Sequence, residues 1–436
     1  MQARIFSAEP RLVGSLRPPP DKSISHRALL LALLARGVSR LDHLSTALDV
    51  AATASMIEGY GASLRVDGSA TLVESSGRTG LIEPDRILDL GNSGTGARLG
   101  IGVATLVPGL SFFTGDDSLR QRPMGRVIDP LRQLGATISA RNGDSYLPAM
   151  VRGGGLVSGT VHLSVASAQV KSALLFAALG VDGPVRVVEP VLSRPHTEEL
   201  FELTGIDLVE DFAEDGEVHG VTIVGPAQPS PFSLRIPGDP SAAAFFVVAA
   251  ACTPGADLDV EEMYLGPTRT GFLEVLEHMG AHLTREHGRL RVQGSSLEGV
   301  EVGGSIIPSL IDEIPILCVA AAFANGLTTI HDAGELRIKE TDRIETTAEL
   351  LTSFGVTVEK LTDGLVVHGG LQPGSLGAGQ RRVGAKLDHR IAMAAAILGM
   401  LAGGTTEIDG VETVATSYPG FFRDLEALSS TTIELG

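Results

Sequence analysis

The sequence predicts an α/β protein built from six copies of one unit, with apolar helices inside and strands facing outward. The same local pattern, the end of a helix, a turn glycine and then a strand, recurs in five segments: GYGASLRV, QLGATISA, LTGIDLVE, HMGAHLTR and SFGVTVEK. Glycine suits this turn because a helix commonly ends on a left-handed residue. The interval between successive turn glycines is longer than the repeat length of ordinary solenoid proteins. The turn glycines, 70 to 75 residues apart, are Gly61, Gly135, Gly205, Gly280 and Gly355.

Helical segments that are apolar all round give the second indication, because such helices must be buried. After each we expect a turn, a strand such as 185–190 and an amphipathic helix such as 126–135. Residues 424–436 supply the last helix and strand without the turn glycine. The apolar segments include residues 28–35, 173–180, 242–251, 316–324 and 392–403.

Length and punctuation predict more than one domain. A chain of 436 residues exceeds what one hydrophobic core usually serves. Candidate crossings between domains are the prolines at 18–20 and the segment IPGDP at 236–240, since proline and glycine punctuate chains. The repeats alone leave open whether the copies divide three and three.

Composition excludes several function classes. The net charge of −18 argues against nucleic acid or an anionic membrane as the main partner. Cys252 and Cys318 lie in apolar runs, so we expect no disulfide framework, zinc cluster or thiol catalyst, and a cytoplasmic location. The start of the chain lacks the blocks of a signal peptide, and no apolar run reaches the roughly 18 residues of a membrane span. We therefore expect a soluble, uncleaved protein.

A short polar opening precedes each buried helix: DKSISHR, GNSGTGAR, SAQVKS, GDPSAA, IDEIP and LDHRIAM. A helix N-terminus carries unpaired amide donors and the positive end of the dipole, which together attract anions. If the openings face a shared cleft, that cleft attracts anions even in an acidic protein.

The first two openings have ordinary alternatives. Ser23 and Arg27 share a helix face, with Lys22 at the tip, but Asp21 or Ser23 could simply cap the helix beside solvated cations. In GNSGTGAR the glycines let backbone amides approach a ligand and Arg98 can bind a phosphate or carboxylate, although a plain tight turn would read the same way.

The later motifs are equally open when taken singly. Capping by Ser167 can coexist with ligand contact by Gln169 and Lys171, and Arg122 in LRQRPMGR belongs to a set more typical of a solvated face. Capping explains one carboxylate of IDEIP and leaves the other available as a base. ELRIKETDR is typical of an exposed helix with ion pairs. The sixth opening supplies Asp388, His389 and Arg390.

Taken together and in this order, the motifs closely resemble the 5-enolpyruvylshikimate-3-phosphate synthase family, over about residues 21 to 419. SAQVKSA and NSGTG resemble its bacterial class II subgroup. The resemblance implies a two-lobed inside-out α/β barrel, with three βαβαββ repeats per lobe, helices buried and sheets outside. The implied lobes are 21–237, mainly for shikimate 3-phosphate, and 1–20 with 238–436, for phosphoenolpyruvate and the catalytic carboxylates.

The resemblance also implies the reaction. The enolpyruvyl group passes from phosphoenolpyruvate to the 5-hydroxyl of shikimate 3-phosphate, phosphate is released, and neither metal nor organic cofactor takes part. Both substrates are phosphorylated, which gives converging helix tips and arginines a physical reason. The implied protein is a monomer acting on small molecules, with no nucleic-acid or membrane partner.

The resemblance assigns roles residue by residue. Asp312 removes the hydroxyl proton, Glu340 protonates the methylene carbon and Lys22 completes the catalytic set. Supporting residues are His389, Thr95 and Arg98. Shikimate 3-phosphate is assigned to Lys22, Ser23, Arg27, Ser167, Gln169, Arg194, Asp312 and Lys339. Phosphoenolpyruvate is assigned to Lys22, Gly94, Arg122, Gln169, Arg343 and Arg390.

Four positions deserve comparison with the family pattern. Thr416 stands where many relatives have a phosphate-binding lysine, Glu335 where asparagine is common, and Ala168 where serine is frequent. Some class II relatives carry alanine at the position of Gly94 and resist glyphosate. We therefore expect glyphosate to bind this chain better than it binds those relatives.

Two other functions compete with this one. An enolpyruvyl transferase acting on UDP-N-acetylglucosamine shares the fold and the donor, but that family usually uses a loop cysteine near GDDSLRQRPMGR, which contains none. A non-catalytic phosphometabolite-binding protein, or one domain of a larger assembly, is the other alternative. The presence of both Asp312 and Glu340 argues against loss of chemistry.

Overall fold

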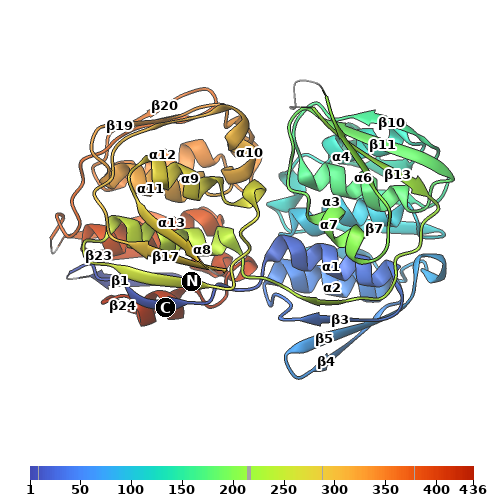
Figure 1. Cartoon of the computed structure of the whole chain (residues 1–436), viewed down its shortest axis with the longest axis horizontal. Helices are drawn as coiled ribbons and strands as arrows, with labels where there is room; N and C mark the ends of the chain where they lie inside the picture. The colour runs from blue at the N-terminus through green and yellow to red at the C-terminus, as the bar shows by residue number, and fades with distance from the viewer. Residues whose placement is uncertain (8, 214–217, 287, 378) are drawn as a thin grey trace. The chain divides into compact units, whose positions relative to one another are not determined.

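The computed structural model describes residues 1–7, 9–213, 218–286, 288–377 and 379–436. The chain divides into two compact units. The first lobe is Pro20–Ile236, and the second lobe is Met1–Pro19 with Pro237–Gly436. The divisions fall within the two proline-containing segments named above. The part of each lobe that the structure describes contains three four-stranded sheets around buried helices (Figure 1).

The inner helices are buried because no face of them is polar enough to meet water. In α8 every residue from Pro240 to Cys252 is buried. Fully burying one large aliphatic side chain contributes roughly 1.5–3 kcal/mol, so these helices dominate the two cores. The inner helices are α1 (Lys22–Leu34), α3 (Gly94–Ala104), α6 (Ala168–Ala178), α8 (Pro240–Cys252), α11 (Ile314–Phe323) and α13 (His389–Ala402).

Each sheet of the first lobe has the same order, with one parallel pairing followed by two antiparallel ones. The sheets of the first lobe are β14 (Ser233–Arg235), β3 (Arg36–Asp42), β5 (Ala70–Ser76), β4 (Ser63–Asp67); β6 (Leu88–Asp89), β7 (Leu110–Thr114), β9 (Tyr146–Arg152), β8 (Thr137–Ala140); and β10 (Gly159–His162), β11 (Gly183–Glu189), β13 (His219–Gly225), β12 (Val209–Phe212).

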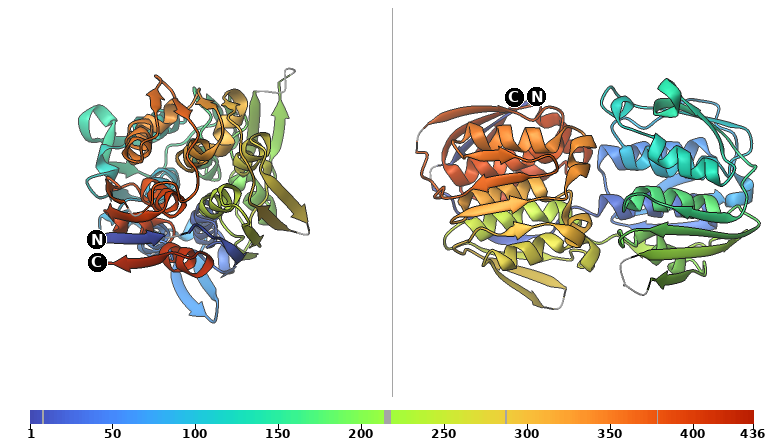
Figure 2. Two further views of the ribbon diagram at one scale, coloured as in Figure 1. Left: turned by 90° about the vertical axis from the view of Figure 1, so that its left-hand side faces the viewer. Right: turned by 90° about the horizontal axis from the view of Figure 1, so that it is seen from above.

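The second lobe repeats this order, but strands from the N-terminus complete two of its sheets. In these, β2 pairs with β15 and β1 lies between β23 and β24. The chain ends therefore lie side by side, with Gln2 N donating to Gly436 O at 2.9 Å (Figure 2). The sheets of the second lobe are β2 (Val13–Leu16), β15 (Asp257–Glu261), β17 (Arg289–Gln293), β16 (His282–Glu286); β18 (Glu301–Val302), β19 (Leu327–Ile330), β21 (Leu365–His368), β20 (Val358–Lys360); and β22 (Gln380–Gly384), β23 (Gly404–Asp409), β1 (Gln2–Ser7), β24 (Thr432–Leu435).

The second helix of each repeat is amphipathic or partly buried, and five of these helices end at the predicted turn glycines. The φ angles of those glycines lie between +77° and +99°, the left-handed region in which glycine has no steric penalty. The predicted helix-ending turns are therefore confirmed. These helices are α2 (Leu48–Gly59), α4 (Gly125–Gln133), α7 (His196–Leu203), α9 (Gly271–His278), α12 (Arg343–Ser353) and α14 (Phe421–Leu428).

Short helical turns fill the connections between the main elements. They are α5 (Arg141–Asp144), α10 (Ile307–Leu310), η1 (Arg78–Gly80), η2 (Leu119–Gln121), η3 (Pro267–Arg269), η4 (Gly304–Ile306), η5 (Gly334–Ile338) and η6 (Val411–Thr416).

These elements confirm the predicted α/β class with helices inside and sheets outside. Within the described residues the strands form separate four-stranded sheets. Close packing of the inner helices depends on glycine at one point: a Cβ on Gly102 of α3 would lie 2.3 Å from the carbonyl oxygen of Ala173 in α6. Any side chain at residue 102 would push these two helices apart.

Cys252 and Cys318 are buried, and burial raises the pKa of each thiol to about 12. Neither thiol is therefore poised as a nucleophile. Across the residues the structure describes, no single helix is long and apolar enough to cross a membrane, although the bent pair Gly304–Leu310 and Ile314–Phe323 passes by length and composition. No group of three or more metal-ligating side chains gathers in the same ranges.

Candidate active site

The first lobe brings the openings of α1, α3 and α6 together through side-chain contacts. Each opening is capped: Asp21 Oδ1 accepts from Ile24 N at 2.7 Å, and Ser93 Oγ accepts from the amide of Gly96 at 3.0 Å. Ser167 Oγ accepts from an amide of α6 at 3.5 Å. The capping alternative therefore holds for Asp21, and it leaves Ser23 available for other contacts.

Arg27 joins three helices from a position that is only 1% exposed. Its Nε donates to Thr197 Oγ1 of α7 at 2.9 Å, and its Nη2 donates to Ser172 Oγ of α6 at 2.8 Å. Its Nη1 donates to Ser23 Oγ at 2.7 Å. The alternative of a solvated cation does not hold for Arg27, and burying a guanidinium at the helix tips creates a strong anion-attracting point.

Lys22, the first residue of α1, contacts Asp49 of α2, with Nζ 2.9 Å from Oδ2. His26, on the same helix as Lys22, is fully buried, and its Nδ1 lies 2.7 Å from Thr53 Oγ1. Burial, with help from the charges of Lys22 and Arg27, lowers the pKa of His26 well below its usual value. His26 is therefore neutral near pH 7, which fits a structural role.

Gln169 links α6 to α3. Its Nε2 donates to Thr95 Oγ1 at 2.9 Å, and its Oε1 accepts from Arg98 Nη1 at 2.8 Å. Arg98 also donates from Nη2 to the carbonyl of Pro123 at 3.2 Å. Two predicted supporting residues thus hold the amide of Gln169, a predicted ligand of both substrates.

Gly94 lets two arginines lie over the tip of α3. A Cβ at Gly94 would be 3.0 Å from Arg122 Nη1 and 3.1 Å from Arg98 Nη1, both closer than ordinary packing allows. Arg122 is only 6% exposed, and its Nη2 donates to Asn92 Oδ1. The solvated-face alternative therefore does not hold for Arg122.

Two residues of the third repeat occupy different surroundings. Arg194 is half-buried in the connection between β11 and α7. Lys171 lies within the lobe with no exposed surface, and its Nζ is 2.6 Å from both Glu189 Oε1 and Glu198 Oε1. The ligand contact left open for SAQVKS therefore does not extend to Lys171, because one turn into α6 its side chain already faces the core.

The two carboxylates that contact His219 predict how the stability of the protein depends on pH. His219 Nδ1 lies 3.0 Å from Glu189 Oε1, and its Nε2 lies 2.9 Å from Glu210 Oε2. Burial alone would lower the pKa of His219, but the hydrogen bonds to these carboxylates leave it raised above 6.5. A raised histidine pKa stabilises the fold fully below the unfolded value, and this contribution is lost as pH rises through the folded value.

We therefore expect the free energy of unfolding of the wild type, minus that of His219→Gln, to fall as pH rises from about 6 toward 8. Urea titrations of both proteins across this range measure that difference. A difference that stays constant or grows with pH would contradict the assignment.

The second lobe places Arg343 at the centre of its charged residues. Arg343 is 1% exposed and begins α12. Its Nε lies 2.8 Å from Asp388 Oδ2, its Nη2 lies 2.6 Å from Glu340 Oε2, and its Nη1 lies 3.3 Å from Asp312 Oδ1. Burial alone would lower its pKa, but the surrounding carboxylates, Asp388 first, raise it well above the usual value.

The exposed-helix alternative for residues 335–343 does not hold. Residues 334–338 form the short turn η5, and the helix starts only at Arg343, capped by Asp342. The intervening segment carries Lys339, whose Nζ lies 3.2 Å from Asp312 Oδ1. Both predicted catalytic carboxylates, Asp312 and Glu340, are thus held by cations of one short segment.

The openings of α11 and α13 differ in how they are capped. Asp388 Oδ1 accepts from the amide of Arg390 at 2.9 Å. Glu313 occupies the cap position of α11 and is fully buried, but its side chain accepts no capping hydrogen bond. Instead its Oε1 lies 3.5 Å from Arg390 Nη1. The neighbouring His389 is 4% exposed.

The residues that depart from the family pattern have local partners or local turns. Thr416 ends η6, where its Oγ1 donates to Thr413 O at 2.7 Å. Glu335 lies in η5, on the same segment as Glu340, the predicted proton donor. Ala168 begins α6, and its carbonyl accepts from Arg27 Nη2 at 3.3 Å.

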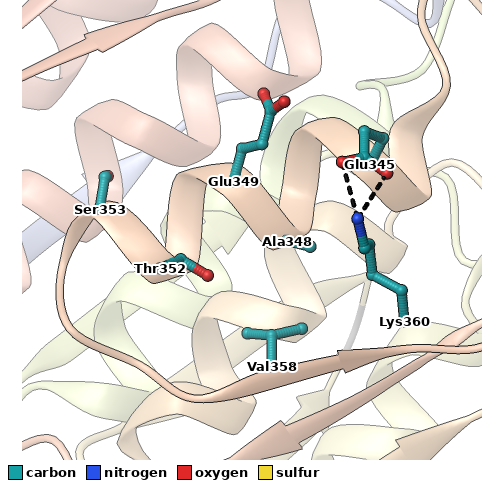
Figure 3. A pocket seen from close by; sticks show the side chains of 7 residues that line it. All are labelled: Glu345, Ala348, Glu349, Thr352, Ser353, Val358 and Lys360. Atoms are coloured by element: carbon teal, nitrogen blue, oxygen red, sulfur yellow. Dashed lines mark hydrogen bonds and ion pairs between the residues drawn. The ribbon is translucent and has the colours of Figure 1, made fainter.

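A shallow hollow elsewhere on the second lobe is not the candidate site. It lies between α12 and β20, and the ion pair between Lys360 Nζ and Glu345 Oε1, at 2.8 Å, runs along it (Figure 3). None of the predicted site residues is among its lining residues, Glu345, Ala348, Glu349, Thr352, Ser353, Val358 and Lys360.

Comparison with known proteins agrees with this arrangement. The family model described as EPSP synthase (3-phosphoshikimate 1-carboxyvinyltransferase) matches residues 7–425. The chain belongs to the EPSP synthase family. It is 45% identical over 427 residues to the 3-phosphoshikimate 1-carboxyvinyltransferase of Anaeromyxobacter sp. (strain Fw109-5), covering 96% of each chain. It is 46% identical to that of Synechocystis sp., covering 95% of this chain and 93% of the relative.

A solved EPSP synthase from Acinetobacter baumannii superimposes with a TM-score of 0.84 at 34% sequence identity, covering all of both chains. The family fold is thereby shown for this EPSP synthase family member. The roles of single site residues stay predictions.

Several contacts that organise the site escaped prediction. Asp49, which contacts Lys22, lies on a second helix that shows no chemical motif. Ser172 is the last residue of SAQVKS, and Thr197 lies three positions after the predicted ligand Arg194, so both stood in or beside recognised positions. A search for hydroxyl side chains next to buried arginines could have found these two, whereas no sequence signal pointed to Asp49.

Proposed function

We propose that the chain is a 3-phosphoshikimate 1-carboxyvinyltransferase, which moves the enolpyruvyl group from phosphoenolpyruvate to the 5-hydroxyl of shikimate 3-phosphate and releases phosphate. Family membership over residues 7–425 supports this function. The observation that carries it is a pair of carboxylates, Asp312 and Glu340, held by one buried guanidinium, that of Arg343. One carboxylate accepts a proton and the other delivers one.

Asp312 is the general base in this proposal. The cations of Lys339 and Arg343, at 3.2 and 3.3 Å, favour the ionised carboxylate that a base requires. As Asp312 takes the proton of the 5-hydroxyl, the hydroxyl oxygen bonds to carbon 2 of phosphoenolpyruvate. Glu340 supplies a proton to carbon 3, which gives a tetrahedral intermediate with a methyl group.

The second half of the reaction restores the double bond. Glu340, now a carboxylate, takes a proton back from the methyl group. The electron pair of that C–H bond forms the double bond as the bond between carbon 2 and the phosphate oxygen breaks. The phosphate departs with the electron pair of that bond. Arginine side chains that are already in place stabilise the charge on this intermediate without reorganisation during the reaction. Within the described residues Arg343 donates four hydrogen bonds to carboxylates, so an incoming anion competes with these carboxylates for the guanidinium group.

We assign shikimate 3-phosphate to Lys22, Ser23, Arg27, Ser167, Gln169, Arg194, Asp312 and Lys339, with its phosphate at Ser23, Arg27, Ser167 and Arg194 and its ring at Asp312 and Lys339. The assigned ligands of phosphoenolpyruvate are Lys22, Gly94, Arg122, Gln169, Arg343 and Arg390. The cations among them supply the charge-assisted hydrogen bonds that phosphates and carboxylates require.

Release of phosphate from phosphoenolpyruvate tests the proposal directly. We expect release with shikimate 3-phosphate and none with UDP-N-acetylglucosamine. Release only with the latter would overturn the assignment. Release with neither acceptor would favour a binding protein.

The Gly94→Ala variant tests the donor side. Its methyl group would lie 3.0 Å from Arg122 Nη1 and 3.1 Å from Arg98 Nη1, so both guanidinium groups must shift by a few tenths of an ångström. We expect the KM for phosphoenolpyruvate to rise about tenfold, which corresponds to ~1.4 kcal/mol. We also expect the inhibition constant of glyphosate to rise more than that KM. Steady-state phosphate release measures both quantities.

Gly125→Ala is the matched control for this substitution. Its Cβ would meet only Asp129 Oδ2 at 3.6 Å, an ordinary contact, so the KM should stay near that of the wild type. An unchanged KM in Gly94→Ala, or a wild-type inhibition constant like those of resistant enzymes, would contradict the assignment.

Two further properties belong to the proposal. The buried, protonated thiols of Cys252 and Cys318 fit a reducing cytoplasm. We also propose a monomer, which light scattering coupled to size-exclusion chromatography would test against the chain mass of 45.3 kDa.

A further inference from the structure

A cluster of buried charged residues lies beneath the segment that carries Arg194. The Lys171 cluster comprises Lys171 of α6, Glu189 at the end of β11, Glu198 in the first turn of α7 and His219 at the start of β13. Each is at most 1% exposed. Burying a charge costs several kcal/mol per ion before any pairing is counted. A buried cluster of charges is therefore weak evidence for a stabilising role and is compatible with a role in substrate binding.

One arm of the cluster fixes the backbone next to Arg194. Glu189 Oε1 accepts from the amide of Ser193 at 3.1 Å. Lys171 Nζ donates to the carbonyl of Ser193 at 3.4 Å and to Glu189 Oε1 at 2.6 Å. Both main-chain polar groups of Ser193 are therefore held from inside the lobe, and the next residue is Arg194.

The other arm fixes the start of α7. Lys171 Nζ lies 2.6 Å from Glu198 Oε1. The residue before Glu198 is Thr197, whose hydroxyl accepts from Arg27 Nε at 2.9 Å and donates to Ser172 Oγ at 2.7 Å. A shift of Glu198 therefore moves the hydroxyl that orients the Arg27 guanidinium.

We propose that Lys171 is a positioning residue that fixes the distance between Arg27 and Arg194, so that both arginines can bind the phosphate of shikimate 3-phosphate. This inference rests on the proposed function. Arg194 is one peptide bond from Ser193, whose carbonyl Lys171 binds. Arg27 is two steps from Glu198, which Lys171 also binds: a peptide bond joins Glu198 to Thr197, and Arg27 Nε donates to the Thr197 hydroxyl. Side chains that bind a phosphate together must be placed within about 0.5 Å, which a rigid buried support provides.

Two of the phosphoenolpyruvate ligands assigned to the first lobe have hydrogen bonds to side chains outside the cluster. Arg122 is held by Asn92 and Ser118, and Gln169 by Thr95 and Arg98. A substitution in the Lys171 cluster should therefore weaken the binding of shikimate 3-phosphate more than the binding of phosphoenolpyruvate. A merely structural role would instead lower the melting temperature and leave the KM values of the folded enzyme unchanged.

Glu198→Gln tests the proposal because it keeps the side-chain shape and removes one charge. We expect the Kd of shikimate 3-phosphate, measured by calorimetry on the full chain, to rise about tenfold. The KM for phosphoenolpyruvate at saturating shikimate 3-phosphate should stay within about twofold. Asp67→Asn is the matched control, since it removes an exposed ion pair to Arg40 on another sheet of the same lobe. That variant should bind like the wild type.

A second variant, Lys171→Gln/Glu198→Gln, keeps the net charge of the cluster and serves if Glu198→Gln does not fold. It should show the same selective loss. Unchanged affinity for shikimate 3-phosphate in a folded variant would overturn the proposal, and so would equal losses for both substrates. A wild type that binds shikimate 3-phosphate without releasing phosphate would instead refute the proposed function, because the binding measurement does not depend on turnover.

Discussion

Replacing Asp312 with asparagine is expected to lower kcat by about 10²- to 10⁴-fold while both KM values change little. Asparagine has the shape of aspartate and can still accept from Lys339, which lies 3.2 Å from Asp312 Oδ1. It cannot take the proton of the 5-hydroxyl. The variant therefore tests proton transfer separately from binding. Phosphate release at varied concentrations of each substrate measures kcat and KM.

Glu340→Gln should give a loss of similar size, because the amide cannot deliver a proton to the methylene carbon. Residues that act in one reaction sequence are not additive, so the double variant should be little slower than the slower single variant. Asp257→Asn, which breaks an exposed ion pair to Arg291, is the control and should keep kcat within about twofold. Near-normal turnover in Asp312→Asn or Glu340→Gln would remove that residue from the mechanism.

Replacing Arg343 with methionine is expected to destabilise the protein by about 3–5 kcal/mol and to abolish tight binding of phosphoenolpyruvate. The substitution removes a cation that contacts Asp388, Glu340 and Asp312. Asp388 has no exposed surface, so its charge would remain buried without that partner. Urea unfolding measures the stability, and the KM for phosphoenolpyruvate measures the binding.

The two expected losses can be separated by a second substitution. Asp388→Asn keeps a side-chain cap for α13 and removes the buried charge. Arg343→Met/Asp388→Asn should therefore recover part of the stability without recovering affinity for phosphoenolpyruvate. The control Arg291→Met removes an arginine that is 52% exposed, and its stability should change by no more than about 0.5 kcal/mol. Recovered affinity in the double variant would contradict the role of Arg343 as a ligand.

Much of the fold could be predicted because each unit carries two strong local signals. A segment apolar all round, such as residues 242–251, has no stable place outside a core. A glycine at a fixed interval marks the turn between helix and strand, as Gly61 and Gly280 do with positive φ. The partners of short edge strands carried no such signal. Neither β14, three residues long, nor β2 reveals in its own sequence that it completes the sheet of a distant repeat.

Single motifs predicted the site less well, because a helix opening reads the same whether its cation faces solvent, ligand or core. Arg27 and Lys171 both follow a cap residue by a few positions, yet Arg27 orders the helix tips while Lys171 pairs with Glu189 inside the lobe. The difference depends on residues far along the chain. Only the full ordered set of motifs pointed to a phosphorylated substrate pair.

Following the carbon atoms of the donor tests the central claim most directly. The wild type is incubated with shikimate 3-phosphate and phosphoenolpyruvate labelled with carbon-13 at the methylene carbon, and the products are read by NMR. The account predicts a labelled enol ether on the 5-oxygen of shikimate 3-phosphate, formed in equal amount with phosphate. Label that remains in phosphoenolpyruvate, or passes to pyruvate alone, would contradict it.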